Sequence, residues 1–240
     1  MSRVRRLVAG VALVACIALA AAAVFSFIRD GREREAYGKV ASAATREDDG
    51  SVKDMAKVRE LCPGAVAWLE VEGTPISYPV MEATEEAPEF YLDHDAWGNR
   101  SAAGVPFLDS RCSVTGSHLL VYGHHVIFTD RMFSPLQKAY EQDVFVGIGD
   151  AIWTTGEGTE RFEPIMSMSV DRSFSPIQSF SFSDISALRG WIASLSVDAT
   201  AKSSASADLA SSAKKVLTLV TCSSDFSGRR QRTLTLFVER

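Results

Sequence analysis

The chain has 240 residues, of which 46% are hydrophobic, and it carries a formal net charge of −5 at pH 7. This acidic balance argues against a nucleic-acid surface, because such surfaces are basic. About 200 residues lie beyond the first apolar segment, and that length is enough for one domain with a buried core.

The first 30 residues differ from the rest because they contain an apolar run. No charged residue occurs from 7 to 28, and about 20 apolar residues cross a bilayer as a helix. Three arginines precede the run, which predicts a cytoplasmic N-terminus and an extracellular remainder, although three further arginines follow it. A signal peptide cleaved near residues 20–23 is the alternative. We favour an uncleaved anchor over residues 1–30, because the apolar run continues past that point.

Two further regions follow the predicted anchor. Residues 31–50 are charged and contain several Ala, Ser and Gly residues, which is typical of a stalk. Residues 51–240 are expected to form the folded domain. It begins with a short helix over 52–61, which ends at Pro63 and Gly64.

The remaining pattern predicts a mainly β barrel or sandwich with short helices. Pro79 places its strand at an edge or brings it to an end. Asp184 is a good N-cap for the longest predicted helix of the domain. We expect strands over 65–71, 76–80, 103–108, 118–122, 145–148, 151–155, 161–170 and 218–222 and a last one through Leu234, Leu236 and Val238, helices over 131–140 and 185–195, and a Ser/Ala-rich loop over 196–212.

The strand Thr218–Cys222 ends in a cysteine and is followed by three arginines, Arg229, Arg230 and Arg232. Positive charge beside a thiol lowers its pKa from roughly 8.5 towards neutrality and so favours the reactive thiolate. A histidine that can serve as a base, His124, directly follows another predicted strand. Cysteine, histidine and arginine at strand ends predict a cysteine transpeptidase or protease.

The other cysteines leave their pairing open. Cys16 lies in the apolar run, while Cys62, Cys112 and Cys222 lie outside it. Three is an odd number, so at least one thiol is free or pairs between chains. A Cys62–Cys112 disulfide would leave Cys222 free, and two buried thiols are the alternative. No Cys-x-x-Cys pair or close Cys/His cluster occurs, so we expect no structural metal.

At these residues the chain resembles the sortase family, and class B sortases in particular. The resemblance spans most of residues 55–240, and the helix-bearing insertion before the cysteine strand is the feature that suggests class B. The matching segments are Thr218–Cys222, Tyr122–His125, Ala67–Leu69 with Gly73–Val80, Phe90–Asp95 and Ala103–Asp109.

The resemblance implies an eight-stranded sortase-type β-barrel with an N-terminal helix and a helix-bearing insertion before the cysteine strand. It also implies a transpeptidase at the surface of Gram-positive bacteria. By resemblance, Cys222 attacks the threonine carbonyl of a C-terminal sorting signal, often Asn-Pro-x-Thr in class B. An amine of a peptidoglycan precursor then resolves the thioacyl intermediate and joins the substrate protein to the cell wall.

The roles of the histidine and the arginine each have an alternative residue. His124 is the acid and base, and His125 takes that role if the register slips by one. Family spacing favours Arg232 as the oxyanion donor, because the guanidinium offers directed hydrogen bonds, with Arg230 as the alternative on the same strand face. Arg229 is expected to be a solvated loop residue.

Four further residues are candidates for substrate binding. They are Thr221 and Ser223, which flank the cysteine, and Ile185 and Leu188 in the insertion helix. The backbone of Ser223 and Ser224 could shape the site, and Asp225 either orients the arginine or histidine or is a plain loop residue. The helix either packs against the barrel, forms a wall of the substrate groove, or does both.

Rival functions are a pilin-polymerising sortase, which would use a lysine as acceptor, and a non-catalytic sortase-like surface module. A papain-like protease is disfavoured, because that family places its cysteine before its histidine. We expect no cofactor and no nucleic-acid partner. The expected partners are sorting-signal-bearing surface proteins, a peptidoglycan precursor amine and the membrane, with a single-pass anchor and an extracellular catalytic domain.

Overall fold

The computed structural model describes residues 3–45, 53–223 and 230–240. The chain divides into two compact units, Met1–Ser42 and Ala43–Arg240. Helix α1 (Arg3–Ala44) runs through the first unit, so the part of the predicted stalk up to Ala44 is helical. Among the described residues, no helix has both the length and the apolarity needed to cross a bilayer. The predicted anchor and the domain boundary at residue 51 stay predictions.

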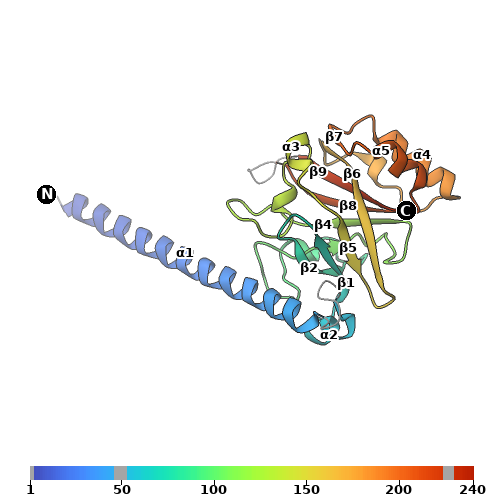
Figure 1. Cartoon of the computed structure of the whole chain (residues 1–240). Helices are drawn as coiled ribbons and strands as arrows, with labels where there is room; N and C mark the ends of the chain where they lie inside the picture. The colour runs from blue at the N-terminus through green and yellow to red at the C-terminus, as the bar shows by residue number, and fades with distance from the viewer. Residues whose placement is uncertain (1–2, 46–52, 224–229) are drawn as a thin grey trace. The chain divides into compact units, whose positions relative to one another are not determined.

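The second unit is a closed β-barrel, as predicted (Figure 1). Eight strands form the ring in the order β5–β1–β2–β3–β4–β8–β9–β6, and β6 pairs with β5 to close it. A further short strand, β7 (Ala201–Lys202), pairs with β6 outside the ring. The ring strands are β1 (Ala65–Val71), β2 (Ser77–Glu82), β3 (Phe107–Leu108), β4 (His118–Tyr122), β5 (Ala151–Thr154), β6 (Thr159–Asp171), β8 (Lys215–Cys222) and β9 (Gln231–Glu239).

Strand β8 is buried on both faces, which explains its nearly continuous apolar sequence. Successive side chains of a strand point to opposite faces. Leu217 and Leu219 belong to the cluster that fills the barrel, together with Trp153 and other buried aromatic residues. Val216 and Val220 belong to a second cluster on the other face, which includes residues of the insertion helix.

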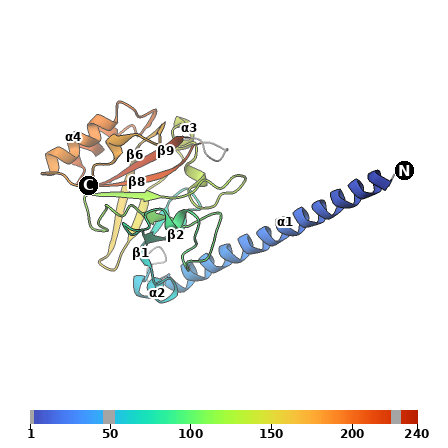
Figure 2. The same cartoon turned by 180° about the vertical axis from the view of Figure 1, so that it is seen from behind.

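The second cluster is covered by α4 (Ile185–Leu195) and α5 (Ser206–Ser212), which lie together beside β6 and β7 (Figures 1 and 2). Helix α4 begins as predicted, because the Asp184 carboxylate accepts a hydrogen bond of 2.8 Å from the backbone N–H of Ala187. The other short helices are α2 (Met55–Leu61), α3 (Gln142–Phe145), and the single 3-10 turns η1 (Phe90–Leu92), η2 (Ser134–Leu136) and η3 (Ser175–Ile177).

Several predicted elements are wrong or shorter, each for a local reason. The predicted strand 145–148 follows α3 and is not a strand, since a short apolar run does not distinguish helix from strand. The predicted helix 131–140 contains only η2, because Met132 has a φ of +49° and Pro135 lacks an N–H. The predicted loop 196–212 contains β7 and α5.

Two strands near prolines are also instructive. The predicted strand 103–108 is reduced to β3, because Gly104 has a φ of +58° and Pro106 follows it. Pro79 pairs with Trp68 of β1. On the other side, β2 meets β3 only at Met81 and Glu82. Pro79 therefore lies inside a ring strand, neither on an edge strand nor at a strand end as predicted, but at a position without a partner in β3, so its missing N–H interrupts no ladder on that side.

Candidate active site at the ends of three neighbouring strands

Strands β4 and β8 bring the predicted histidine and cysteine to the same end of the barrel. The two strands are parallel neighbours, and Tyr122 is aligned with Val220. The backbone N–H of Gly123 continues the pairing with a 3.0 Å hydrogen bond to the Val220 carbonyl. His124 lies two residues beyond Tyr122, and Cys222 lies two residues beyond Val220. Both residues are therefore at the same end of the barrel.

The predicted arginine lies on the other side of the cysteine. Strands β8 and β9 are antiparallel, and Cys222 is the direct partner of Arg232. Side chains of directly opposed residues lie on the same face, with Cβ atoms about 4.5–5.5 Å apart. Both side chains are partly exposed. The register therefore places the Arg232 side chain on the same face as the Cys222 thiol, on the neighbouring strand.

His124 is oriented by a backbone carbonyl of another segment. Its Nε2 lies 2.7 Å from the Leu92 carbonyl oxygen. A carbonyl only accepts hydrogen bonds, so Nε2 carries a proton. In the neutral ring Nδ1 is then the nitrogen that exchanges a proton. The neighbouring His125 instead forms an isolated β-bridge with Met132, through its backbone.

Arg230 is bound to an acid. Its Nε and Nη2 donate to the two carboxylate oxygens of Asp171, each at 2.8 Å. Hydrogen bonds from Arg230 and Ser173 hold the pKa of Asp171 well below its usual range. The Arg232 Nη1 donates to the Gln231 carbonyl at 3.0 Å. Arg229, Ser224 and Asp225 lie outside the described residues.

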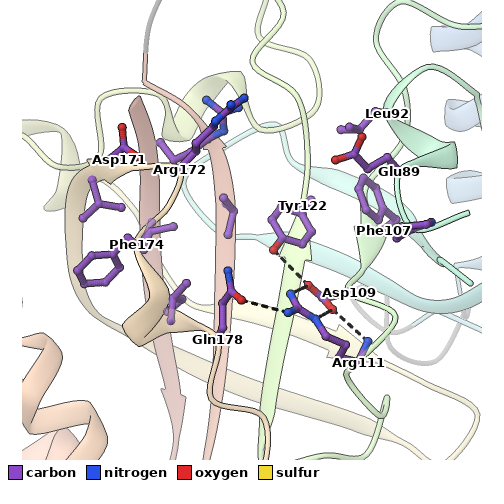
Figure 3. A pocket seen from close by; sticks show the side chains of 16 residues that line it. Glu89, Leu92, Phe107, Asp109, Arg111, Tyr122, Asp171, Arg172, Phe174 and Gln178 are labelled. Atoms are coloured by element: carbon purple, nitrogen blue, oxygen red, sulfur yellow. Dashed lines mark hydrogen bonds and ion pairs between the residues drawn. The ribbon is translucent and has the colours of Figure 1, made fainter. Parts of the chain in front are cut away.

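A cavity of about 380 Å³ adjoins this strand edge. Arg232, Val220 and Leu234 form its floor from β8 and β9. Figure 3 shows Arg172 and Phe174 on one side and Leu92 and Phe107 on the other. The cavity is therefore an opening between the end of β6 with the segment 172–178 that follows it, here called the insertion wall, and segment 88–92. Cys222 itself is not a lining residue, but it shares its strand face with Val220.

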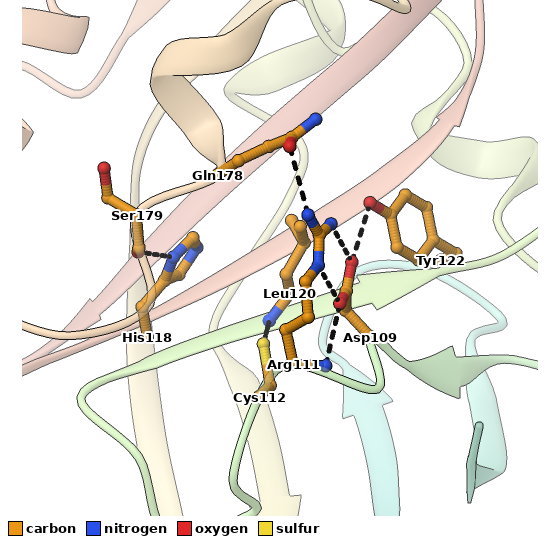
Figure 4. A network of polar contacts seen from close by, with 8 residues as sticks. All are labelled: Asp109, Arg111, Cys112, His118, Leu120, Tyr122, Gln178 and Ser179. Carbon is orange, nitrogen blue, oxygen red and sulfur yellow. Dashed lines mark hydrogen bonds and ion pairs between the residues drawn. The ribbon is translucent and has the colours of Figure 1, made fainter. Parts of the chain in front are cut away.

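A polar network around the buried Asp109 lies at one end of the cavity (Figure 4). Asp109 accepts hydrogen bonds from Arg111 Nε at 2.8 Å, Arg111 Nη2 at 2.7 Å and the Tyr122 hydroxyl at 3.1 Å. Burial alone would raise the pKa of Asp109, but the bonds and charge of Arg111, with the bond from Tyr122, lower it overall. Burial and the Asp109 charge raise the pKa of Tyr122. Asp109 is thus held ionised and Tyr122 neutral.

The four predicted substrate-binding residues lie in different surroundings. Thr221 is 2% exposed and faces the barrel interior, while Ser223 is partly exposed, and its backbone N–H points to the Gln231 carbonyl at 3.4 Å. Leu188 is buried in the cluster beneath α4, whereas Ile185 is 43% exposed. None of the four lines the cavity. Their roles in substrate binding stay predictions.

The remaining cysteines are free thiols, so no Cys62–Cys112 disulfide is present. Burial raises the pKa of Cys62 to about 11, with a smaller contribution from the Asp95 charge. Burial likewise raises the pKa of Cys112 to about 11. Within residues 3–45, 53–223 and 230–240, no group of three His, Cys, Asp or Glu residues could hold a metal ion.

Sequence reasoning missed the residues of the insertion wall and the network. Asp109 and Tyr122 stand in segments used for the family resemblance, but no role was assigned to them. An acidic and a basic residue, Asp109 and Arg111, stand two residues apart directly after a predicted strand. This spacing could have indicated an ion pair. Gln178 offered none, because it lies 67 residues from its partner Arg111.

The barrel is the sortase fold, and the solved structures similar to it include sortases of class B. Clostridium perfringens sortase B is 24% identical, covering 78% of this chain and 99% of that one, with a TM-score of 0.66. A Staphylococcus aureus sortase B–substrate complex is 17% identical, covering 89% and 98%, with a TM-score of 0.73. Sortase B from Bacillus anthracis in complex with AAEK1 is 18% identical, covering 89% and 100%, with a TM-score of 0.69. No protein-family model and no curated protein matches the chain.

Proposed function

We propose that the chain is a sortase-type cysteine transpeptidase in which Cys222, His124 and Arg232 form the catalytic site. One observation carries the proposal. The register pairs Cys222 directly with Arg232, and the parallel neighbour β4 ends two residues before His124. The proposed nucleophile, proton carrier and oxyanion donor thus lie at the ends of three adjacent strands, at the same end of the barrel. The wider likeness in fold to sortase B structures supports it.

In this proposal the Cys222 thiolate attacks a peptide carbonyl, and the oxyanion that forms is stabilised by the Arg232 guanidinium. The C–N bond then breaks, and His124 gives its proton to the departing amine, which leaves a thioester on Cys222. An incoming amine gives its proton to His124 and attacks the thioester. A new amide forms and the thiolate returns, so atoms and protons balance over the cycle.

Arg232 is favoured over Arg230 by their different partners. Arg230 is held by both oxygens of Asp171, whereas Arg232 lies opposite Cys222 and borders the cavity. A guanidinium already committed to a carboxylate has fewer donors for an oxyanion.

The finer assignment is to class B. The substrate would be a C-terminal sorting signal of the Asn-Pro-x-Thr kind, cleaved after threonine, and the acceptor a peptidoglycan precursor amine. Two observations support this: the similar solved structures include a sortase B–substrate complex and a sortase B complexed with triglycine, and a helix-bearing insertion precedes β8, as the class B resemblance implies.

The test uses the full-length chain in mild detergent with a panel of sorting peptides. We expect mass spectrometry to find a thioacyl adduct on Cys222 with an Asn-Pro-x-Thr peptide and none in Cys222→Ala. Arg232→Lys should lower the rate of adduct formation at least about a hundredfold, the range lost with one oxyanion donor, and the matched Arg230→Lys much less. A folded wild type that forms no adduct with any peptide would sink the proposal and favour the non-catalytic module.

The acceptor separates the two enzymatic alternatives. Adding oligoglycine or a diamino acid to the preformed adduct should yield the amide product if a cell-wall precursor is the acceptor. A product only with a lysine-containing pilin-like peptide would favour a pilin-polymerising sortase.

We also propose that residues 1–30 anchor the chain in the membrane, with residues 51–240 outside the cell. The support is the uncharged run from 7 to 28. Intact cells expressing the chain should retain it in the membrane fraction after carbonate washing, and added protease should remove the catalytic domain. Recovery in the soluble fraction would contradict the anchor.

A further inference from the structure

The insertion wall, residues 172–178, borders the cavity and belongs to the long connection between β6 and β8. Its β6 end is held by the Arg172 N–H, which donates to the Arg230 carbonyl at 2.7 Å. The Pro176 carbonyl accepts a 2.8 Å hydrogen bond from Trp191 Nε1 of α4. Its other end, at Gln178, meets the β4 side of the cavity through Arg111. We propose that Arg111 is a positioning residue, which ties the insertion wall to strand β4 and so sets the shape of the cavity that receives the substrate. The inference rests on the proposed function.

Arg111 contacts both sides at once (Figure 4). On the β4 side, Nε and Nη2 bind the two oxygens of Asp109, which also accepts the Tyr122 hydroxyl. On the wall side, Nη1 donates to Gln178 Oε1 at 3.1 Å. The guanidinium carbon also lies 4.7 Å from the ring centroid of Phe180, two residues further on. One planar group therefore contacts Asp109, Gln178 and Phe180 directly and is linked to Tyr122 through Asp109.

The chemistry of arginine suits this position. A guanidinium offers a rigid fork for the Asp109 carboxylate, one more donor for Gln178 and a flat face for Phe180. Lysine would keep the charge but could not make all three contacts in the same geometry. Tyr122 extends the link to β3, because its ring stacks on that of Phe107, its direct partner on that strand, at 5.5 Å between ring centroids.

The expected effect is on substrate binding more than on chemistry. Arg111, Asp109 and Gln178 line the cavity, but the strand register places none of them beside Cys222. If the insertion wall moves, a smaller fraction of molecules has a cavity of the right shape for the peptide. The apparent affinity for the peptide then falls in proportion to that fraction. The Cys222–Arg232 pairing lies within the β-ladder, in which Val170 of β6 pairs with Arg232 from the other side, so the pairing does not require Arg111.

The experiment compares Arg111→Met, Arg111→Lys and Gln178→Ala with wild type in the full-length chain. Arg161→Met is the matched control, because Arg161 also binds carboxylates, Glu72 and Asp150, but lines no described cavity. Two readouts are taken. One is KM and kcat for the peptide that acylates Cys222, and the other is hydrogen exchange of residues 172–184.

We expect Arg111→Met to raise KM at least tenfold while kcat falls less than threefold, with Arg111→Lys and Gln178→Ala between it and wild type. Exchange of residues 172–184 should speed up in Arg111→Met and stay unchanged in Arg161→Met. A fall in kcat with unchanged KM, or unchanged exchange at 172–184, would overturn the proposal. If wild type forms no adduct, the proposed function fails, and exchange alone decides whether Arg111 holds the wall.

Discussion

Gly123 separates Tyr122 from His124, and its replacement by alanine tests how tightly this corner is built. A Cβ at this position would lie 2.5, 2.6 and 2.9 Å from three atoms of the Phe133 ring. Favourable carbon contacts lie at about 3.5–4.0 Å. Phe133 is fully buried, and its backbone N–H donates to the His124 carbonyl at 2.9 Å. The ring therefore cannot move away without shifting the backbone of His124.

The cost follows from this overpacking. Inserting a methyl group into a filled core destabilises by about 1–3 kcal/mol. For a domain of roughly 200 residues, each kcal/mol lowers Tm by roughly 2–4 °C. We expect Gly123→Ala to lower Tm by about 2–12 °C in thermal denaturation followed by circular dichroism. The rate of Cys222 acylation should fall about tenfold or more, since small misplacements of a catalytic group cost up to about a hundredfold.

Gly190→Ala is the matched control, for which we expect a change in Tm of the opposite sign. Gly190 lies in α4, and nothing lies within 4 Å of an added Cβ. Alanine is favoured over glycine inside a helix by about 1 kcal/mol, so Tm should rise slightly and acylation should not change. A Gly123→Ala protein as stable and active as wild type would refute the argument that Phe133 and His124 are mechanically linked.

Three further predictions concern buried groups. Burial lowers the pKa of His118 to about 4, so the histidine of the unfolded chain takes up a proton at a higher pH than that of the folded chain. The free energy of unfolding measured in urea should therefore fall by up to about 3 kcal/mol between pH 6.5 and pH 4. The substitution His118→Gln should make this fall smaller. Cys62 and Cys112, both with a pKa of about 11, should alkylate at pH 8 far more slowly in the native chain than in urea, by mass spectrometry. Glu160→Gln should cost about 1–3 kcal/mol in urea unfolding at pH 7, because the buried Lys215 loses its anionic partner; an unchanged value would contradict this.

The ring strands that carry the catalytic candidates were predictable from sequence for a physical reason. Strands β4 and β8 carry apolar residues, Leu119 to Val121 in β4 and Val216, Leu217, Leu219 and Val220 in β8, that are all buried, and their ends are marked by Gly123 and by Cys222. The pairing of Cys222 with Arg232 required only a short loop and a strand period of two. Local patterns therefore placed all three candidates at strand ends.

The insertion wall was not predictable in the same way. Its shape depends on Arg111, on Gln178 and on the buried His118, which lies 2.8 Å from the Ser179 carbonyl oxygen and 2.9 Å from Thr218 Oγ1. These contacts join residues 61 to 100 positions apart in the sequence. A polar residue in a loop has no periodicity that reveals such a partner, so the contacts emerge only from the tertiary fold.

The parallel pairing of β4 with β8 also governs when reactivity can arise during folding. The two strands are joined by almost a hundred residues of intervening chain, and β9 must then insert between β8 and β6 before the ring closes. Contacts between distant segments form slowly, because the entropy of closing a long loop is lost before the contacts are gained. During synthesis His124 emerges about a hundred residues before Cys222 and Arg232. Under the proposed mechanism, a partly made chain therefore holds an unassisted thiol at most, and the barrel topology delays activation of that thiol until β9 closes the ring.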